Sequence, residues 1–259
     1  MSERPKQKLS REELRATLLA AGQDILHEEG LETGSSNLTF KRVFERVEEK
    51  SGLRLTNASV IRRVWENQAD FQADVLAAIA YDEGRPEIDL TINAVAALFD
   101  DVDLSTPESR ARTLAEMLRI GGEASSEAIA SSANWSLWIS VVAMATTATR
   151  PDQRHRVQAA LLDGYTSVTK YWEETYTGLM GILGVRIRPP WTMRQFTMAV
   201  TAYSEGCSLR QRIDGHAERI VRPTGPHGAD QEWTLFAVGL EALVHQFFEP
   251  DPEFVAPSS

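Results

Sequence analysis

The apolar positions near the N-terminus predict two amphipathic helices. Residues 10–29 carry apolar side chains three and four positions apart, which places them on one helical face. Ser10 and Glu13 have the spacing of a capping box, and Gly30 follows as a stop. Residues 38–50 repeat the apolar pattern and end at a Ser-Gly pair. Each helix needs a partner for its apolar face.

The stretch TNASVIRRVWENQADF, residues 56–71, predicts a third helix and the start of a fourth. Thr56 or Asn57 can cap the third helix, and its inward stripe ends at Trp65. The fourth helix begins at Asn67 and is long enough, at about 1.5 Å per residue, to connect two modules. Because three short helices can enclose a small core, we expect a head domain over residues 1–66 and a body over residues 67–259.

The rest of the chain also follows a helical pattern. Helices are expected at residues 87–100, 107–120, 123–131, 134–148, 152–177, 190–212 and 230–248, with breaks at Gly-, Pro- and Ser-rich positions. The Gly-Gly pair between 120 and 123 is one of these breaks. No alternation with a period of two is long enough to indicate a strand. The sequence therefore predicts an all-α fold.

Charge is distributed unevenly along this chain, whose net charge is −10. Residues 1–65 contain 12 Lys and Arg against 10 Asp and Glu, whereas residues 66–259 contain 15 against 27. An acidic body is repelled by phosphate, but a slightly basic head can still approach it. The distribution therefore permits a nucleic-acid partner for the head.

Several classes of protein are disfavoured by what the chain lacks. A single cysteine, Cys207, excludes an internal disulfide, and the five histidines show neither zinc-site nor catalytic spacing. No Gly-rich phosphate loop or nucleophile elbow is present, so we expect no enzyme activity, metal or cofactor. No apolar run reaches about 18 residues, which indicates a cytoplasmic protein that does not span a membrane.

The second and third predicted helices have the outline of a helix-turn-helix. In such a motif the second helix enters the DNA major groove with its N-terminal residues against base edges, while basic side chains contact phosphates. The residues expected to bind DNA are Thr39, Lys41, Arg42, Arg54, Thr56, Asn57, Ser59, Arg62 and Arg63. The competing interpretation is that these arginines only hydrate an exposed face, as most surface arginines do.

The segments LLAAGQDILHEEG, LTFKRVFERV and SVIRRVWENQADFQADVL resemble the DNA-binding domain of the tetracycline-repressor (TetR) family of bacterial transcriptional regulators. The resemblance is strongest over residues 9–76. In that family the first helix ends near a Gly, a Thr opens the second, and an aromatic residue closes the recognition helix six residues before an apolar anchor. Gly30, Thr39, Trp65 and Phe71 take those places here. The resemblance implies that Trp65 and Phe71 hold the recognition helix against the fourth helix.

Two features depart from the family pattern. The family usually has a Tyr in the recognition helix and a Lys just after it, both on phosphate, whereas the matching positions here are Arg62 and Gln68. In addition, Thr39 and Trp65 are 26 positions apart, which is longer than the usual spacing. The connection between the second and third helices must therefore be longer than in the family.

Large aromatic side chains are frequent in the middle of the chain, where the resemblance implies an effector pocket. Residues expected to line it are Asn134, Trp135, Trp138, Met144, Tyr165, Tyr171 and Trp172. Glu173 can add a polar anchor. At helical spacing, any one such aromatic residue is more often plain core. The resemblance also implies a homodimer formed through the helices near 190–212 and 230–248.

Together these patterns predict a homodimeric DNA-binding transcriptional regulator, a repressor by family habit, which a small-molecule effector releases from a double-stranded operator. The alternative is a helical small-molecule-binding or protein-interaction module whose head does not bind DNA. The missing Lys and the longer turn favour this alternative. The two interpretations differ in one expected feature, because DNA binding requires the basic side chains of the head to share a face.

Overall fold

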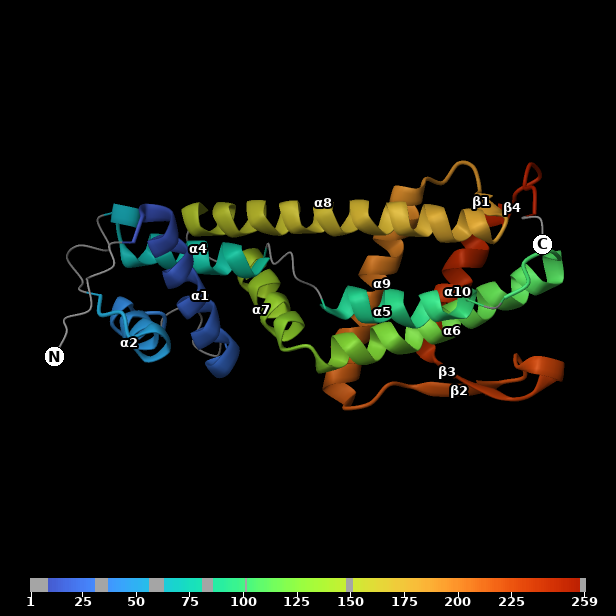
Figure 1. The fold of residues 1–259 in the computed structure, drawn as a ribbon, viewed down its shortest axis with the longest axis horizontal. Coiled ribbons are helices and arrows are strands. Elements are labelled where there is room, and N and C mark those ends of the chain that lie inside the picture. The colour runs from blue at the N-terminus through green and yellow to red at the C-terminus, as the bar shows by residue number, and fades with distance from the viewer. Residues whose placement is uncertain are drawn as a thin grey trace. The chain divides into compact units, whose positions relative to one another are not determined.

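The computed structural model describes residues 9–30, 37–55, 63–80, 86–100, 102–147 and 151–256. Helices account for most of these residues, which confirms the all-α class (Figure 1). The chain divides into two compact units. The first comprises Met1–Glu83 and Ala133–Tyr165, and the second comprises Gly84–Ser132 and Thr166–Ser259. The functional division into a head and a body stays a prediction.

The first unit contains four complete helices and the beginning of a fifth among its described residues. They are α1 (Arg11–Glu29), α2 (Phe40–Ser51), α4 (Gln68–Ala80), α7 (Ala133–Thr147) and the start of α8 (Pro151–Ile182). The predicted capping box is present, since Ser10 Oγ accepts from the Glu13 amide at 3.1 Å and Glu13 Oε2 accepts from the Ser10 amide at 2.8 Å. Gly30 ends α1 at a φ of 71°, as expected.

The core of the first unit forms where α1, α2 and α4 meet. Leu18, Val43 and Phe71 are completely buried there. Gly22 of α1 lies against Val75 of α4 so closely that a Cβ atom would come within 2.7 Å of a Val75 methyl group. These contacts give each predicted amphipathic face a partner.

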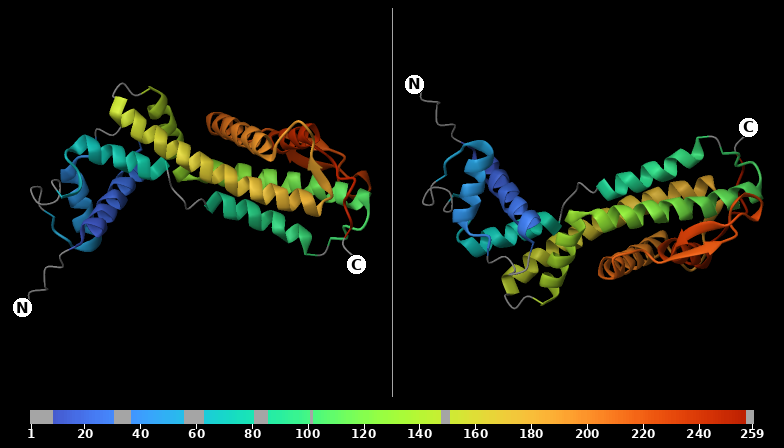
Figure 2. Two further views of the ribbon diagram at one scale, coloured as in Figure 1. Left: turned by 90° about the horizontal axis from the view of Figure 1, so that it is seen from above. Right: turned by 90° about the horizontal axis from the view of Figure 1, so that it is seen from below.

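The second unit is built on α5 (Pro86–Ala96), which continues as the 3-10 helix η1 (Ala97–Phe99), and on α6 (Pro107–Ser131), α9 (Met193–Asp214) and α10 (Leu235–Phe247). Helices α5 and α6 run side by side (Figure 2).

The expected break at the Gly-Gly pair was wrong, because α6 continues through Gly121 and Gly122. A Cβ atom on Gly122 would lie 2.7 Å from Ala237 Cβ and 3.0 Å from Ala237 Cα. The lack of a side chain at Gly122 therefore allows α6 and α10 to approach each other closely. A glycine that ends a helix and one that admits a neighbouring backbone look alike in a single sequence.

The C-terminal end of α9 is tied to the C-terminal end of α6. Arg212 donates to the carbonyl oxygens of Ile129 and Ser132 at 2.9 and 2.6 Å, and Ser126 Oγ donates to Gln211 Oε1 at 2.6 Å. The last carbonyls of a helix lack partners within the helix. A side chain of α9 therefore completes the end of α6.

Two short antiparallel ladders correct the expectation that the chain has no strands. They pair β1 (Val185–Ile187) with β4 (Phe248–Pro250), and β2 (Arg219–Arg222) with β3 (Gln231–Thr234). Strands of three or four residues are too short to show a period-two pattern. Because β3 occupies the start of the segment expected as a helix from residue 230, α10 begins at Leu235 instead, with Thr234 as its N-cap.

An aromatic cluster forms the centre of the second unit. Phe196 of α9 lies 5.3 Å from Tyr176, 5.6 Å from Phe247 and 4.8 Å from Phe248, measured between ring centroids. Burial raises the pKa of the Tyr176 phenol, so this group stays neutral in the core. The centre of the second unit is thus held together by aromatic and other apolar contacts.

Candidate nucleic-acid interface

The N-terminus of α2 begins as the sequence predicts. Thr39 is the N-cap, and its Oγ1 accepts from the Arg42 amide at 3.4 Å. Lys41 follows in the first turn with 86% of its side chain exposed, and its Nζ is 3.9 Å from Glu45 Oε1. An ion pair this long and exposed is worth little. Lys41 is therefore available to an anion in solution.

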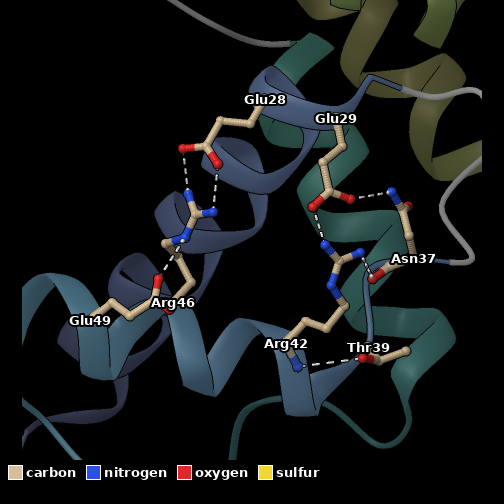
Figure 3. A network of polar contacts seen from close by, with 7 residues as sticks. All are labelled: Glu28, Glu29, Asn37, Thr39, Arg42, Arg46 and Glu49. Atoms are coloured by element: carbon tan, nitrogen blue, oxygen red, sulfur yellow. Dashed lines mark hydrogen bonds and ion pairs between the residues drawn. The ribbon is translucent and has the colours of Figure 1, made fainter.

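The other basic side chains of α2 form ion pairs with carboxylates of α1. Figure 3 shows two of these pairs, Arg42 with Glu29 and Arg46 with Glu28. We call Arg42, Arg46 and Lys50 the basic row, and Glu29, Glu28 and Asp24 the acidic row. The rows pair in reverse order along the chain, as Arg42–Glu29, Arg46–Glu28 and Lys50–Asp24. Residues four apart lie on one helical face. This spacing holds for all three members of the basic row and, in the acidic row, for Asp24 and Glu28.

The central pair contains the least exposed side chain of the basic row, Arg46, although its partner Glu28 is 59% exposed. Arg46 donates to both oxygens of Glu28, at 2.7 and 2.6 Å, and its Nε is 3.5 Å from Glu49 Oε2. Only 17% of the Arg46 side chain is exposed. The hydrogen bonds from Arg46 lower the pKa of Glu28, so its carboxylate is charged at neutral pH.

Arg42 is held by a different set of partners. It forms an ion pair with Glu29 and donates to the Asn37 carbonyl oxygen at 3.3 Å. Asn37 Nδ2 in turn donates to Glu29 Oε2 at 3.2 Å. The hydrogen bond from Arg42, followed by the one from Asn37, lowers the pKa of Glu29. The end of α1 and the start of α2 are thus joined by a small network of hydrogen bonds and one ion pair.

Arg54 follows α2 in the connection toward the predicted recognition helix. Its Nε donates to Glu48 Oε1 at 2.5 Å, although 84% of the Arg54 side chain is exposed. This hydrogen bond raises the pKa of Arg54, which is cationic at any physiological pH. Its exposure allows it to exchange Glu48 for another anion.

Trp65 and Phe71 make the contact that the sequence predicts. Their ring centroids are 4.9 Å apart in an edge-on arrangement, and both side chains are buried. Trp65 Nε1 also donates to Asp74 Oδ2 at 2.8 Å, and the same oxygen accepts from Arg15 at 3.0 Å. The C-terminal end of the segment with the recognition residues is therefore anchored to α4 and, through Asp74, to α1.

The structure places part of the predicted DNA-binding set. Thr39, Lys41 and Arg42 share the first turn of α2, Arg54 lies in the following connection, and Arg63 is helical and exposed. Four further members, Thr56, Asn57, Ser59 and Arg62, lie outside the described residues.

The acidic row and Asp74 are members of the site that were not predicted from the sequence. The signal was present in the spacing, because Asp24 and Glu28 are four apart, as are Arg42, Arg46 and Lys50. Which acidic row faces which basic row depends on tertiary packing.

The residues expected to line an effector pocket are divided between the two units. Asn134, Trp135, Trp138, Met144 and Tyr165 belong to the first, and Tyr171 and Trp172 belong to the second. Trp138 is buried in the first core with Tyr165 edge-on at 5.4 Å. Trp172 stacks on Tyr176 at 5.2 Å. Trp138 is therefore part of a packed core, as the simpler interpretation of the aromatic stripe expects.

Glu173, the expected polar anchor, lies on α8 within the second unit. Its Oε1 is buried, and no donor among the described residues bonds to it. A buried carboxylate oxygen without a donor is costly unless something compensates it.

One face of α9 is apolar and exposed. Met198, Leu209 and Ile213 have exposed fractions of 54%, 45% and 71%. Their spacing, with the exposed Ala202 and Gly206 between them, follows a single helical face. A continuous apolar stripe of this kind often marks an interface.

Comparison with known proteins does not assign this chain to a family. No family model matches the chain, and no curated protein matches it. The crystal structure of a candidate transcriptional regulator from Rhodococcus sp. RHA1 is similar over 78% of this chain and 85% of its own, with 13% sequence identity and a TM-score of 0.38. At this level the likeness carries no argument about function.

Among the described residues, no single helix is both long and apolar enough to cross a membrane. Helices α6 and α7 have the necessary length and apolar character only when they are taken together.

Proposed function

We propose that this chain is a sequence-specific DNA-binding transcriptional regulator. The observation that carries the proposal is the anchoring of Trp65 on Phe71 and Asp74. It fixes the end of a segment whose residues Asn57, Ser59, Arg62 and Arg63 have the chemistry for bases and phosphates. The capped N-terminus of α2, with Lys41 exposed beside it, supplies a second anchor for the DNA backbone.

The proposed regulator acts as a homodimer through α9 and α10. The exposed apolar face of α9 supports this, because burying Met198, Leu209 and Ile213 against a second copy removes them from water. A two-fold dimer presents two recognition helices to successive major grooves, with centres about 34–36 Å apart or a multiple of that. The operator is then a palindrome or close to one.

We further propose that the regulator is a repressor, as is usual in the family that its head resembles, and that an effector releases it from the operator. A ligand shifts such an equilibrium only if it binds one conformation better than the other. In the first unit the candidates for contact are Asn134, Trp135, Trp138, Met144 and Tyr165. Tyr171, Trp172 and Glu173 are the candidates in the second unit.

The ion pairs of the head favour one alternative, which is a helical interaction module that does not bind DNA. Arg42, Arg46, Lys50 and Arg54 all contact carboxylates. Cations neutralised in this way attract phosphate less strongly than free ones.

Fluorescence anisotropy separates the two functions. The purified protein is titrated against the DNA upstream of its own gene and against a scrambled duplex, at two salt concentrations. We expect tight, salt-sensitive binding to the upstream DNA alone. Arg63→Ala should weaken it and reduce the salt slope by about one if Arg63 contacts a phosphate. Equal or absent binding to both duplexes by the folded protein would favour the interaction module.

A further inference from the structure

The three pairs that join α1 to α2 differ in how enclosed they are. Arg46 is bound by both oxygens of Glu28 and lies close to Glu49. The Arg42 side chain is more open than that of Arg46, with 38% exposed against 17%, although Glu29 at 36% is less exposed than Glu28 at 59%. An exposed ion pair contributes little to stability, because water solvates both charges. The Arg42–Glu29 pair can therefore open at little cost. Arg46, in contrast, is held by Glu28 and Glu49 and joins α1 to α2.

Arg42 also occupies the place where a phosphate is expected. It lies in the first turn of α2, one residue after the exposed Lys41 and three after the N-cap Thr39. The amides of a first helical turn and its positive end attract anions. Guanidinium groups bind carboxylates and phosphates through the same donors. Glu29 takes an Nη2 donor of Arg42 and neutralises its charge, so a phosphate binds Arg42 at full strength only after the carboxylate has moved away.

We propose that Glu29 is an internal competitor for DNA phosphate at Arg42, and that it keeps the affinity for DNA of unrelated sequence low. The inference rests on the proposed DNA-binding function and assigns a regulatory role to a residue of α1. On unrelated DNA, Arg42 stays on Glu29. On the operator, the base contacts of the recognition helix hold the backbone close enough for phosphate to replace the carboxylate. Glu29 therefore increases the ratio of specific to non-specific binding.

The competition predicts a definite change in salt dependence. Each phosphate contact adds about 0.9 to the slope of log affinity against log salt concentration, which is roughly a threefold change between about 50 and 200 mM. Glu29→Gln keeps the shape of the side chain and removes its charge. We expect this variant to bind a labelled scrambled duplex about threefold more tightly than the wild type near 50 mM salt, and about equally near 200 mM.

A double-mutant cycle assigns the effect to Arg42. Wild type, Glu29→Gln, Arg42→Ala and the double variant are titrated by anisotropy with the scrambled duplex. A gain from Glu29→Gln that disappears in the Arg42→Ala background supports the proposal. An equal gain in both backgrounds would overturn it, since the effect would then come from a general loss of negative charge. No gain in either background would overturn it too.

Glu28→Gln is the matched control, because Glu28 neighbours Glu29 and pairs with the enclosed Arg46. We expect it to lower the midpoint of urea unfolding without the gain in DNA affinity. A gain equal to that of Glu29→Gln would remove the special role of Glu29. The urea midpoints of all variants show whether each is folded at the temperature of the titration.

The upstream DNA distinguishes failure of this inference from failure of the proposed function. If the wild type binds its upstream DNA specifically and Glu29→Gln leaves the scrambled duplex unaffected, the competition is wrong and the regulator stands. If no folded variant binds either duplex, the DNA-binding function is wrong and the competition fails with it.

Discussion

The contact of α1 with α2 in the first unit and the contact of α6 with α10 in the second are made by different means. In the first, α1 and α2 enclose apolar side chains and are joined at the surface by the acidic and basic rows. In the second, α6 and α10 approach so closely at Gly122 and Ala237 that no side chain fits between them. Ion pairs at a surface respond to salt and pH. A contact between two closely packed backbones is sensitive to any side-chain volume that a substitution adds. Substitutions and solution conditions should therefore affect the two units differently.

The largest effect is expected from Trp65→Ala in the first unit. It removes a buried indole and leaves Asp74 without one of its donors, so we expect a loss of about 3–5 kcal/mol in the free energy of unfolding. Urea denaturation measures this loss. Trp191→Ala is the control, because Trp191 is 36% exposed in the second unit and should cost less. Similar losses for the two variants would contradict the anchoring role of Trp65.

Gly122→Ala tests the second unit with one added methyl group. The new Cβ atom meets Ala237 at its backbone as well as its side chain, so α6 and α10 must move apart, at a cost of roughly 1–3 kcal/mol. Gly178→Ala in α8 is the matched control, because that Cβ atom would point into open space. The control should be neutral or stabilising by up to about 1 kcal/mol. A thermal melt that ranks the two variants the other way would refute the packing argument.

Ser10→Ala removes the capping box at the start of α1. The loss should be about 1 kcal/mol, since one amide of the first turn loses its acceptor. Hydrogen exchange of the α1 amides should increase near the N-terminus and remain unchanged in α10. An unchanged exchange rate at Glu13 would show that the cap contributes nothing in solution.

The smallest effect concerns pH and the acidic row. The pKa values of Glu28 and Glu29 are lowered from 4.5 by hydrogen bonds from Arg46 and Arg42. A lowered pKa in the folded state stabilises it above the unfolded value, and this contribution is lost as pH falls through the folded value. We therefore expect the Glu28→Gln/Glu29→Gln variant to lose less stability than the wild type as pH falls below about 4.5. Parallel pH profiles of the urea midpoint would contradict this.

Local signals predicted much of the first unit. The capping box, the stop at Gly30 and the contact of Trp65 with Phe71 all follow from residue type and spacing within a few turns. The path of α6 through Gly122 could not be predicted, because the reason is a backbone more than a hundred residues later in the chain. Nor could the pairing of Arg42 with Glu29, since spacing within one helix does not tell which helix lies opposite.

The link from Arg212 to the end of α6 has a consequence for synthesis. The last carbonyls of α6 accept hydrogen bonds from a side chain that is 80 and 83 positions away in the sequence. At roughly 5–20 residues per second, a ribosome needs about 4–16 s to add that much chain. During this interval the carbonyls of Ile129 and Ser132 lack the Arg212 donor that they have in the folded protein. The end of α6 can therefore reach its final hydrogen bonding only after α9 has been synthesised.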